Sequence, residues 1–173
     1  GDGTIAAPFA SIQAGITGAV AQGKTKVHVA GGTYGGFTAA SGVSVLGGFD
    51  QDLVAGGGNG ATDVTVEAAP GATAVTVANA ALPVTLKDLT IVGGGGTNAS
   101  AVLIVGSTVT LDSVSVDSGV ASGTGSSAYG VRVINQSDRT KPVTIEQSRV
   151  AATRGADAAA STVGAAGSGG NGC

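Results

Sequence analysis

Charged and aromatic residues are scarce in this chain, and their scarcity excludes several classes of function. Lys, Arg, Asp and Glu make up 11% of the 173 residues, well below the roughly 25% of an ordinary globular domain. The eight Lys and Arg form no cluster, so the basic surface that nucleic-acid binding requires is missing and we predict no nucleic-acid partner. Aromatic residues make up 3%, which leaves few rings on which a sugar could stack.

Cysteine, histidine and long apolar runs are almost absent as well. Because Cys173 is the single cysteine, no disulfide can form within the chain, and any partner of Cys173 must lie outside it. No His/Cys cluster has metal-ligand spacing, so we predict neither a metal nor another cofactor. No window approaches the ~18 apolar residues of a membrane span, so no span is predicted. The sequence opens on Gly1-Asp2-Gly3 and not on a signal peptide pattern, and we expect a mature product whose targeting segment has been removed.

Two families of related segments recur along the second half of the chain. Each family returns after about 25 to 35 residues, an interval typical of a solenoid in which every turn is one repeat. The first family comprises VTLKDLTIVGG from Val84, VTLDSVSVDSG from Val109 and VTIEQSRVAAT from Val143, and the second comprises AVTVANA from Ala74, AVLIVGS from Ala101 and GVRVINQ from Gly130.

Alternate positions of the first family are apolar, and this alternation predicts strands with one buried face. If the repeats stack in register, like residues lie over like at about 4.8 Å, the spacing of neighbouring strands. No single turn could bury its apolar edge alone, so successive turns must stack. The predicted columns are Val84/Val109/Val143, Leu86/Leu111/Ile145 and Ile91/Val116/Val150.

The pattern resembles right-handed parallel β-helix proteins of the pectin-lyase-like superfamily, in which V-x-L-x-x-L-x-I-x-G segments recur from coil to coil. The opening of the chain is similar to the first coil of many secreted members, with PFASIQAGITGAVAQG from Pro8, VHVAGGTY from Val27 and VSVLGGFD from Val43. The resemblance covers nearly the whole chain and is more specific for the fold than for an activity. It implies an all-β fold, a right-handed single-stranded parallel β-helix with an N-terminal capping α-helix.

We expect one domain over residues 1–173, with a helix cap at about 11–22, coils at about 26–151 and a Gly/Ala-rich tail at 152–173. In the helix, Ser11 is the expected N-cap, Ile12, Ile16 and Val20 form one face, and Gly23 ends it. Such a helix can cover the open end of the first coil. Strands are also predicted at 26–29, 43–46, 64–67 and 75–77.

Two further segments are expected to lie outside the regular coils. The Ser/Gly-rich stretch 118–128 is predicted to project from the solenoid, where insertions often form a binding face. The tail has two interpretations, a flexible segment or a longer solenoid that is cut partway, and we favour a fragment of a longer solenoid.

Three features suggest chemistry that their context does not support. Gly18–Thr25 satisfies the phosphate-loop pattern, but a helix precedes it and a strand follows, the reverse of the order that directs a helix N-terminus at phosphate. His28 has no partner motif and is expected to point outward as an ordinary surface residue. Asn98-Ala99-Ser100 and Asn135-Gln136-Ser137 fit the N-glycosylation pattern, which matters only in a eukaryotic secretory route.

The carboxylates leave two hypotheses open. The resemblance implies that members which cleave polysaccharides by elimination hold Ca²⁺ with acidic residues and use Lys or Arg as the base, whereas the hydrolases use clustered aspartates. Asp88, Asp112, Asp117 and Arg149 could lie on nearby coils. The alternative is a surface ladder, because Lys87, Asp112 and Glu146 share one column whose sign of charge changes along it. We therefore name no catalytic residue.

Three functional classes follow from these observations. The first is a non-enzymatic extracellular, secreted or cell-surface module, a rigid scaffold for adhesion or for protein or glycan partners. The second is a polysaccharide-binding or polysaccharide-cleaving domain, a lyase or glycoside hydrolase, which the fold resemblance alone supports. The third is a self-assembling segment that associates end to end through an open terminal coil.

Overall fold

The computed structural model describes residues 1–50, 64–134 and 140–157, which form one helix and three parallel β-sheets. The strands predicted at 26–29, 43–46, 64–67 and 75–77 are all present, with ends that differ by a few residues from prediction. The elements are α1 (Ile12–Ala21), β1 (Lys26–Ala30), β2 (Gly32–Gly35), β3 (Phe37–Thr38), β4 (Ser44–Phe49), β5 (Val64–Glu67), β6 (Val75–Ala78), β7 (Val84–Lys87), β8 (Thr90–Val92), β9 (Ala99–Val105), β10 (Val109–Asp112), β11 (Ser115–Asp117), β12 (Ala128–Ile134), β13 (Val143–Glu146) and β14 (Arg149–Ala151).

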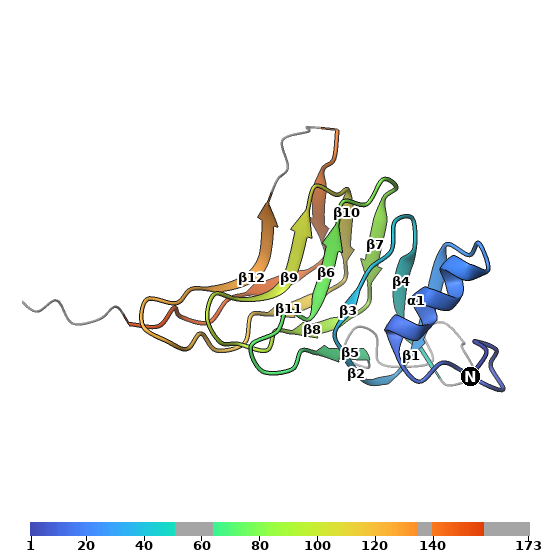
Figure 1. Ribbon diagram of the computed structural model, residues 1–173, viewed down its shortest axis with the longest axis horizontal. Coiled ribbons are helices and arrows are strands. Elements are labelled where there is room, and N and C mark those ends of the chain that lie inside the picture. The colour runs from blue at the N-terminus through green and yellow to red at the C-terminus, as the bar shows by residue number, and fades with distance from the viewer. Residues whose placement is uncertain (51–63, 135–139, 158–173) are drawn as a thin grey trace, which may run out of the picture.

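Each sheet is built from every third strand of the chain. The first sheet has the order β1-β4-β7-β10-β13, the second β14-β11-β8-β5-β2 and the third β12-β9-β6-β3. Consecutive strands therefore visit the three sheets in turn, and we call three such strands a coil. Figure 1 shows the strands of successive coils side by side, with α1 at one end of the row. The predicted all-β parallel architecture is confirmed at this level and is compatible with a solenoid-like fold.

The register of the strands follows the alignment of the repeats. In the first sheet Leu86 pairs with Leu111, and Leu111 pairs with Ile145. In the second sheet Val116 lies between Ile91 and Val150. These pairs confirm the predicted columns. A slip of one residue in any strand would instead turn its aliphatic side chains to the opposite face of the sheet.

The inward columns of the three sheets form one apolar core. Leu86, Leu111, Ile91, Val116 and Ile104 are fully buried. Burial of each such side chain stabilises the fold by about 1.5–3 kcal/mol.

Helix α1 begins where the sequence predicts, but one of its predicted buried residues is wrong. The Ser11 hydroxyl accepts a hydrogen bond from the Ala14 N–H at 3.2 Å, which identifies Ser11 as the N-cap. Ala19 is buried, whereas Val20 is 55% exposed. At 100° per residue Val20 lies about 80° round the helix from Ile12, so Ala19 takes the inward position instead.

The helix covers the N-terminal end of the sheets. It packs against β1 and β3, and Gly15 allows close approach, because a Cβ there would lie 3.0 Å from Val27 Cγ1. The Gln13 Oε1 accepts a hydrogen bond at 2.8 Å from the N–H of Thr38 on the edge strand β3. The helix therefore buries apolar surface and satisfies a donor that an open edge would leave unpaired.

Two segments expected outside the coils are instead stacked against one another. In the stretch 118–127, the Val120 carbonyl accepts from the Gly96 N–H of the preceding coil at 2.9 Å. Residues 152–157, assigned to the tail, continue this layer, since the Ala156 N–H donates to the Ser126 carbonyl at 2.8 Å. Backbone hydrogen bonds therefore join the loop to the preceding coil and join residues 152–157 to the loop.

Some predictions concern residues that the structure does not describe. Cys173, the Asn135 glycosylation pattern and the tail from 158 onward lie outside the described residues. Within the described ranges, no helix has both the length and the hydropathy to cross a bilayer.

We predict that shortening a side chain within one column lowers the free energy of unfolding by an amount that depends on which coil carries that side chain. Leu111→Ala should lower the free energy of unfolding by about 3 kcal/mol, because it opens a cavity in the core. Ile145→Ala is the matched control in the same column; Ile145 is 47% exposed, so its loss should cost about 1 kcal/mol or less. Urea unfolding measures both, and equal costs would contradict the stacking of the columns.

Candidate functional site

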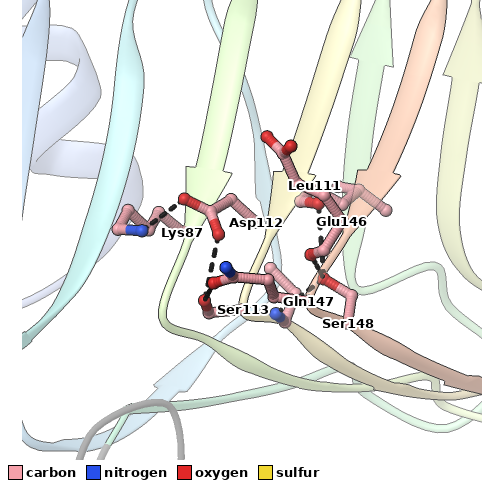
Figure 2. A network of polar contacts seen from close by, with 8 residues as sticks. Lys87, Leu111, Asp112, Ser113, Glu146, Gln147 and Ser148 are labelled. Carbon is pink, nitrogen blue, oxygen red and sulfur yellow. Dashed lines mark hydrogen bonds and ion pairs between the residues drawn. The ribbon is translucent and has the colours of Figure 1, made fainter.

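A group of polar side chains crosses β7, β10 and β13 at the ends of these strands (Figure 2). Lys87, Asp112 and Glu146 occupy one register position on the three strands. Because residues of a strand alternate between its two faces and Leu86, Leu111 and Ile145 form the inward column, this position faces outward. We call these residues, with Ser113, Gln147 and Ser148, the polar ladder.

The ladder lies where each coil leaves the first sheet for the second. Asp88, Ser113 and Gln147, which follow the three strands, have left-handed backbone φ angles of 52°, 56° and 50°. The short carboxylate side chain of Asp88 tolerates this conformation better than most because it can hydrogen-bond locally. The same turn therefore recurs in each coil and places polar side chains above one another.

The ion pair of the ladder joins two neighbouring coils. The Lys87 ammonium donates to the Asp112 carboxylate, and Figure 2 shows the two side chains directed at each other. This hydrogen bond lowers the pKa of Asp112 and raises the pKa of Lys87. The Ser113 hydroxyl also donates to Asp112 Oδ1 at 3.0 Å, which further favours the ionised carboxylate.

The predicted attraction does not extend along the whole column. Glu146 is the register neighbour of Asp112, so two acidic residues are adjacent on β10 and β13. Among the described residues no ion pair holds the Glu146 carboxylate, which is exposed. The expected attractive ladder is correct for Lys87 and Asp112 but wrong for Asp112 and Glu146, because like charges at directly opposed positions repel.

Ser148 is a member of the ladder that the sequence pattern did not identify. Its hydroxyl accepts from the Val114 N–H at 2.9 Å and donates to the Glu146 carbonyl at 2.7 Å. The buried residues Leu89 and Val114 occupy the corresponding place in the two preceding coils. A serine at an otherwise aliphatic position of the repeat was the signal that could have revealed this contact.

The remaining candidate acids are not brought together. Asp88 contributes electrostatically to the raised pKa of Lys87, so it lies near the ladder. Asp117 Oδ1 accepts from the Gly119 N–H at 2.9 Å, a local turn contact on the second sheet. Arg149 is exposed on β14. The Asp88 N–H donates to the Asp112 backbone carbonyl at 3.1 Å. Within the described residues no side-chain hydrogen bond or ion pair joins any of these three to Asp112.

The N-terminal candidates are placed as predicted. His28 is exposed and stacks on the Phe49 ring with the centroids 4.4 Å apart. The phosphate-loop match covers the last turn of α1 and the turn before β1, in the reversed order. The Gln22, Gly23 and Lys24 N–H groups donate to carbonyls of the last helical turn. Those amides are committed to ending the helix, so they do not form a phosphate cradle.

A cavity of about 540 Å³ lies between the N-terminal segment, α1 and β1. Phe9 and Val27 line it together with Lys24, Lys26 and Tyr34. The two lysines are exposed, and the Tyr34 hydroxyl already donates to the Ala30 carbonyl at 2.8 Å. The cavity lining is therefore mixed, since Asp2 and the two lysines line it beside the apolar Phe9 and Val27.

Asn98, the described member of the two glycosylation patterns, is exposed with a left-handed φ of 53°. Its Oδ1 accepts from the Ser127 N–H at 3.4 Å. Ser100 of the same pattern is buried. These contacts give Asn98 a role in holding two adjacent loops together.

Neither the metal-ligating residue types nor the comparisons with known proteins identify a further site. No group of three or more His, Cys, Asp or Glu in the described part of the chain is placed to hold a metal ion. No family model, no curated protein and no solved structure matches this sequence. The contacts of the ladder are structural: one ion pair and several hydrogen bonds join adjacent coils, and the Glu146 carboxylate is exposed at the end.

We predict a pH-dependent contribution from the contact between Lys87 and Asp112. Asp112→Asn should lower the free energy of unfolding at pH 7 by up to about 1 kcal/mol. Because the folded-state pKa of Asp112 is lowered, the contribution is present above the unfolded pKa of about 4 and is lost as the pH falls through the folded pKa. The raised pKa of Lys87 preserves it until the pH rises above about 10.

Urea unfolding of the wild type and Asp112→Asn near pH 7 and near pH 2 measures this difference. Glu146→Gln is the matched control, since it removes a neighbouring acid without an ion pair and should cost nothing at pH 7. The assignment to the Lys87–Asp112 ion pair would be contradicted if Asp112→Asn were still less stable than the wild type near pH 2. It would also be contradicted if Glu146→Gln lost as much stability as Asp112→Asn at pH 7.

Proposed function

We propose that this chain is a non-enzymatic extracellular or cell-surface module that acts as a rigid scaffold for a protein or glycan partner. We also propose that its parallel sheets wind as a right-handed single-stranded β-helix of the pectin-lyase type. The strand order supports the winding, because each coil adds one strand to each sheet. The repeat spacing of the sequence supports it independently.

The observation that carries the scaffold role is the commitment of Asp112 to a contact between coils. A carboxylate that binds Ca²⁺ or acts as a general acid needs an open position for the metal or substrate. Asp112 instead accepts from the Lys87 ammonium and the Ser113 hydroxyl. Asp117 likewise accepts from a backbone amide in its own turn. These contacts favour a role in joining successive coils.

The continuous core supports the rigidity that a scaffold needs. Columns of fully buried aliphatic side chains run through the stacked coils, and such interiors are close-packed. Stacked repeats present long regular surfaces, on which partners can bind without a concave active site.

The proposal predicts no release of sugar from neutral or acidic polysaccharides, with or without Ca²⁺. The matched control is the triple variant Asp88→Asn, Asp112→Asn, Asp117→Asn, which should give the same blank result. On glycan and protein arrays the wild type should bind a partner, and the triple variant should retain that binding. Sugar release by the wild type that the triple variant loses would overturn the proposal in favour of the enzyme.

A further inference from the structure

The last strand of each sheet exposes side chains whose counterparts in the preceding coil are buried. We call β12, β13 and β14 the C-terminal edge, since they end the third, first and second sheets. On this edge Ile145, Val150 and Val133 are 47%, 42% and 43% exposed. Their register neighbours in the preceding coil, Leu111, Val116 and Ile104, are fully buried. The edge therefore continues the core columns to the surface.

The opposite end of the stack shows how an edge of this fold is closed. There α1 packs on β1 and β3, and the Gln13 side chain accepts from an edge amide. At the C-terminal edge no described element lies beyond β12, β13 and β14. An edge strand in a parallel sheet directs alternate N–H and C=O groups away from its one neighbour, so these groups form a template for another strand.

The polar side chains of the edge specify the charge of the residue that would complete it. In the ladder Lys87 neutralises Asp112, whereas Glu146 follows with no ion pair among the described residues. A basic side chain at the same register position of a strand added beyond β13 would pair with Glu146. It would also offset the repulsion between Glu146 and Asp112. On the same strand as Glu146, the exposed Thr144 extends the column of Thr85 and Thr110. The added strand should therefore also carry a β-branched or polar residue on its outer face.

We propose that the C-terminal edge is a docking surface for an extended strand from a partner protein, which adds in parallel as the next rung. The strand carries aliphatic residues at alternate positions and a Lys or Arg over Glu146. Residues 158–173 of this chain are a poor source, because Val163 is their single aliphatic residue larger than alanine. This inference stands on the edge alone and holds whether or not the scaffold role is correct.

The chain supplies a suitable probe, a fluorescent peptide with the sequence of residues 84–92, VTLKDLTIV. In register, its first and third residues lie over Val143 and Ile145, its lysine over Glu146, and its isoleucine over Val150. We expect saturable binding to the whole protein by fluorescence anisotropy. A peptide of the same composition, in which neighbouring residues are exchanged so that the aliphatic positions move to the other face, should bind at least about tenfold more weakly.

A charge exchange tests the assignment to Glu146. Replacing the peptide's lysine with glutamate should weaken binding by about threefold, and Glu146→Lys in the protein should reverse the preference of the two peptides. Ile145→Lys should weaken binding by about tenfold or more. Thr144→Lys, which faces outward, is its matched control and should leave the affinity within about twofold. Because Glu146 is exposed, Glu146→Lys keeps the test valid even if Ile145→Lys fails to fold.

Three results would overturn the proposal. The first is no saturable binding of the in-register peptide, and the second is equal binding of the exchanged peptide. The third is a protein that doubles in mass with concentration, loses this association in Ile145→Lys and ignores the peptide, since a second copy would then occupy the edge. None of these results depends on polysaccharide cleavage, so failure here and failure of the scaffold role are distinguishable.

Discussion

The parallel register between successive coils is the constraint on which the rest of the structure depends. It places Leu86, Leu111 and Ile145 in one column and directs Lys87, Asp112 and Glu146 to the opposite face. A slip of one residue would bury the charges and expose the aliphatic residues, at a cost of several kcal/mol for each coil. The apolar core, the ion pair and the exposed edge therefore follow from the same pairing.

Much of this pairing could be predicted because the repeat encodes it locally. Alternating Val, Leu and Ile identify the strands, and the recurrence of VTL and VTI identifies which strands are neighbours. Val20 was wrongly predicted to be buried, because eight residues after Ile12 the helix has turned its side chain about 80° away from the buried face. The stacking of 152–157 was missed because it rests on backbone hydrogen bonds such as that from Ala156 to Ser126, which composition does not encode.

The polar ladder illustrates why a functional site was harder to predict than the fold. Residue types place Lys87, Asp112 and Glu146 in one column, but only coordinates show that the Lys87 ammonium forms its ion pair with Asp112 and not with Glu146. The same holds for Ser148, whose hydroxyl replaces a buried aliphatic group with hydrogen bonds to the backbone. The chemistry of this surface is therefore set by the order in which the coils stack, and its unsatisfied groups collect at the C-terminal edge.

The most direct test of the stacking is a methyl NOESY spectrum of the protein with labelled Leu, Ile and Val methyl groups. Neighbouring strands are about 4.8 Å apart, so the stacking predicts strong cross-peaks between Leu86 and Leu111 and between Leu111 and Ile145. Between Leu86 and Ile145, two rungs apart, the cross-peak should be weak or missing. A strong cross-peak between Leu86 and Ile145, or none between Leu86 and Leu111, would contradict the register and the architecture built on it.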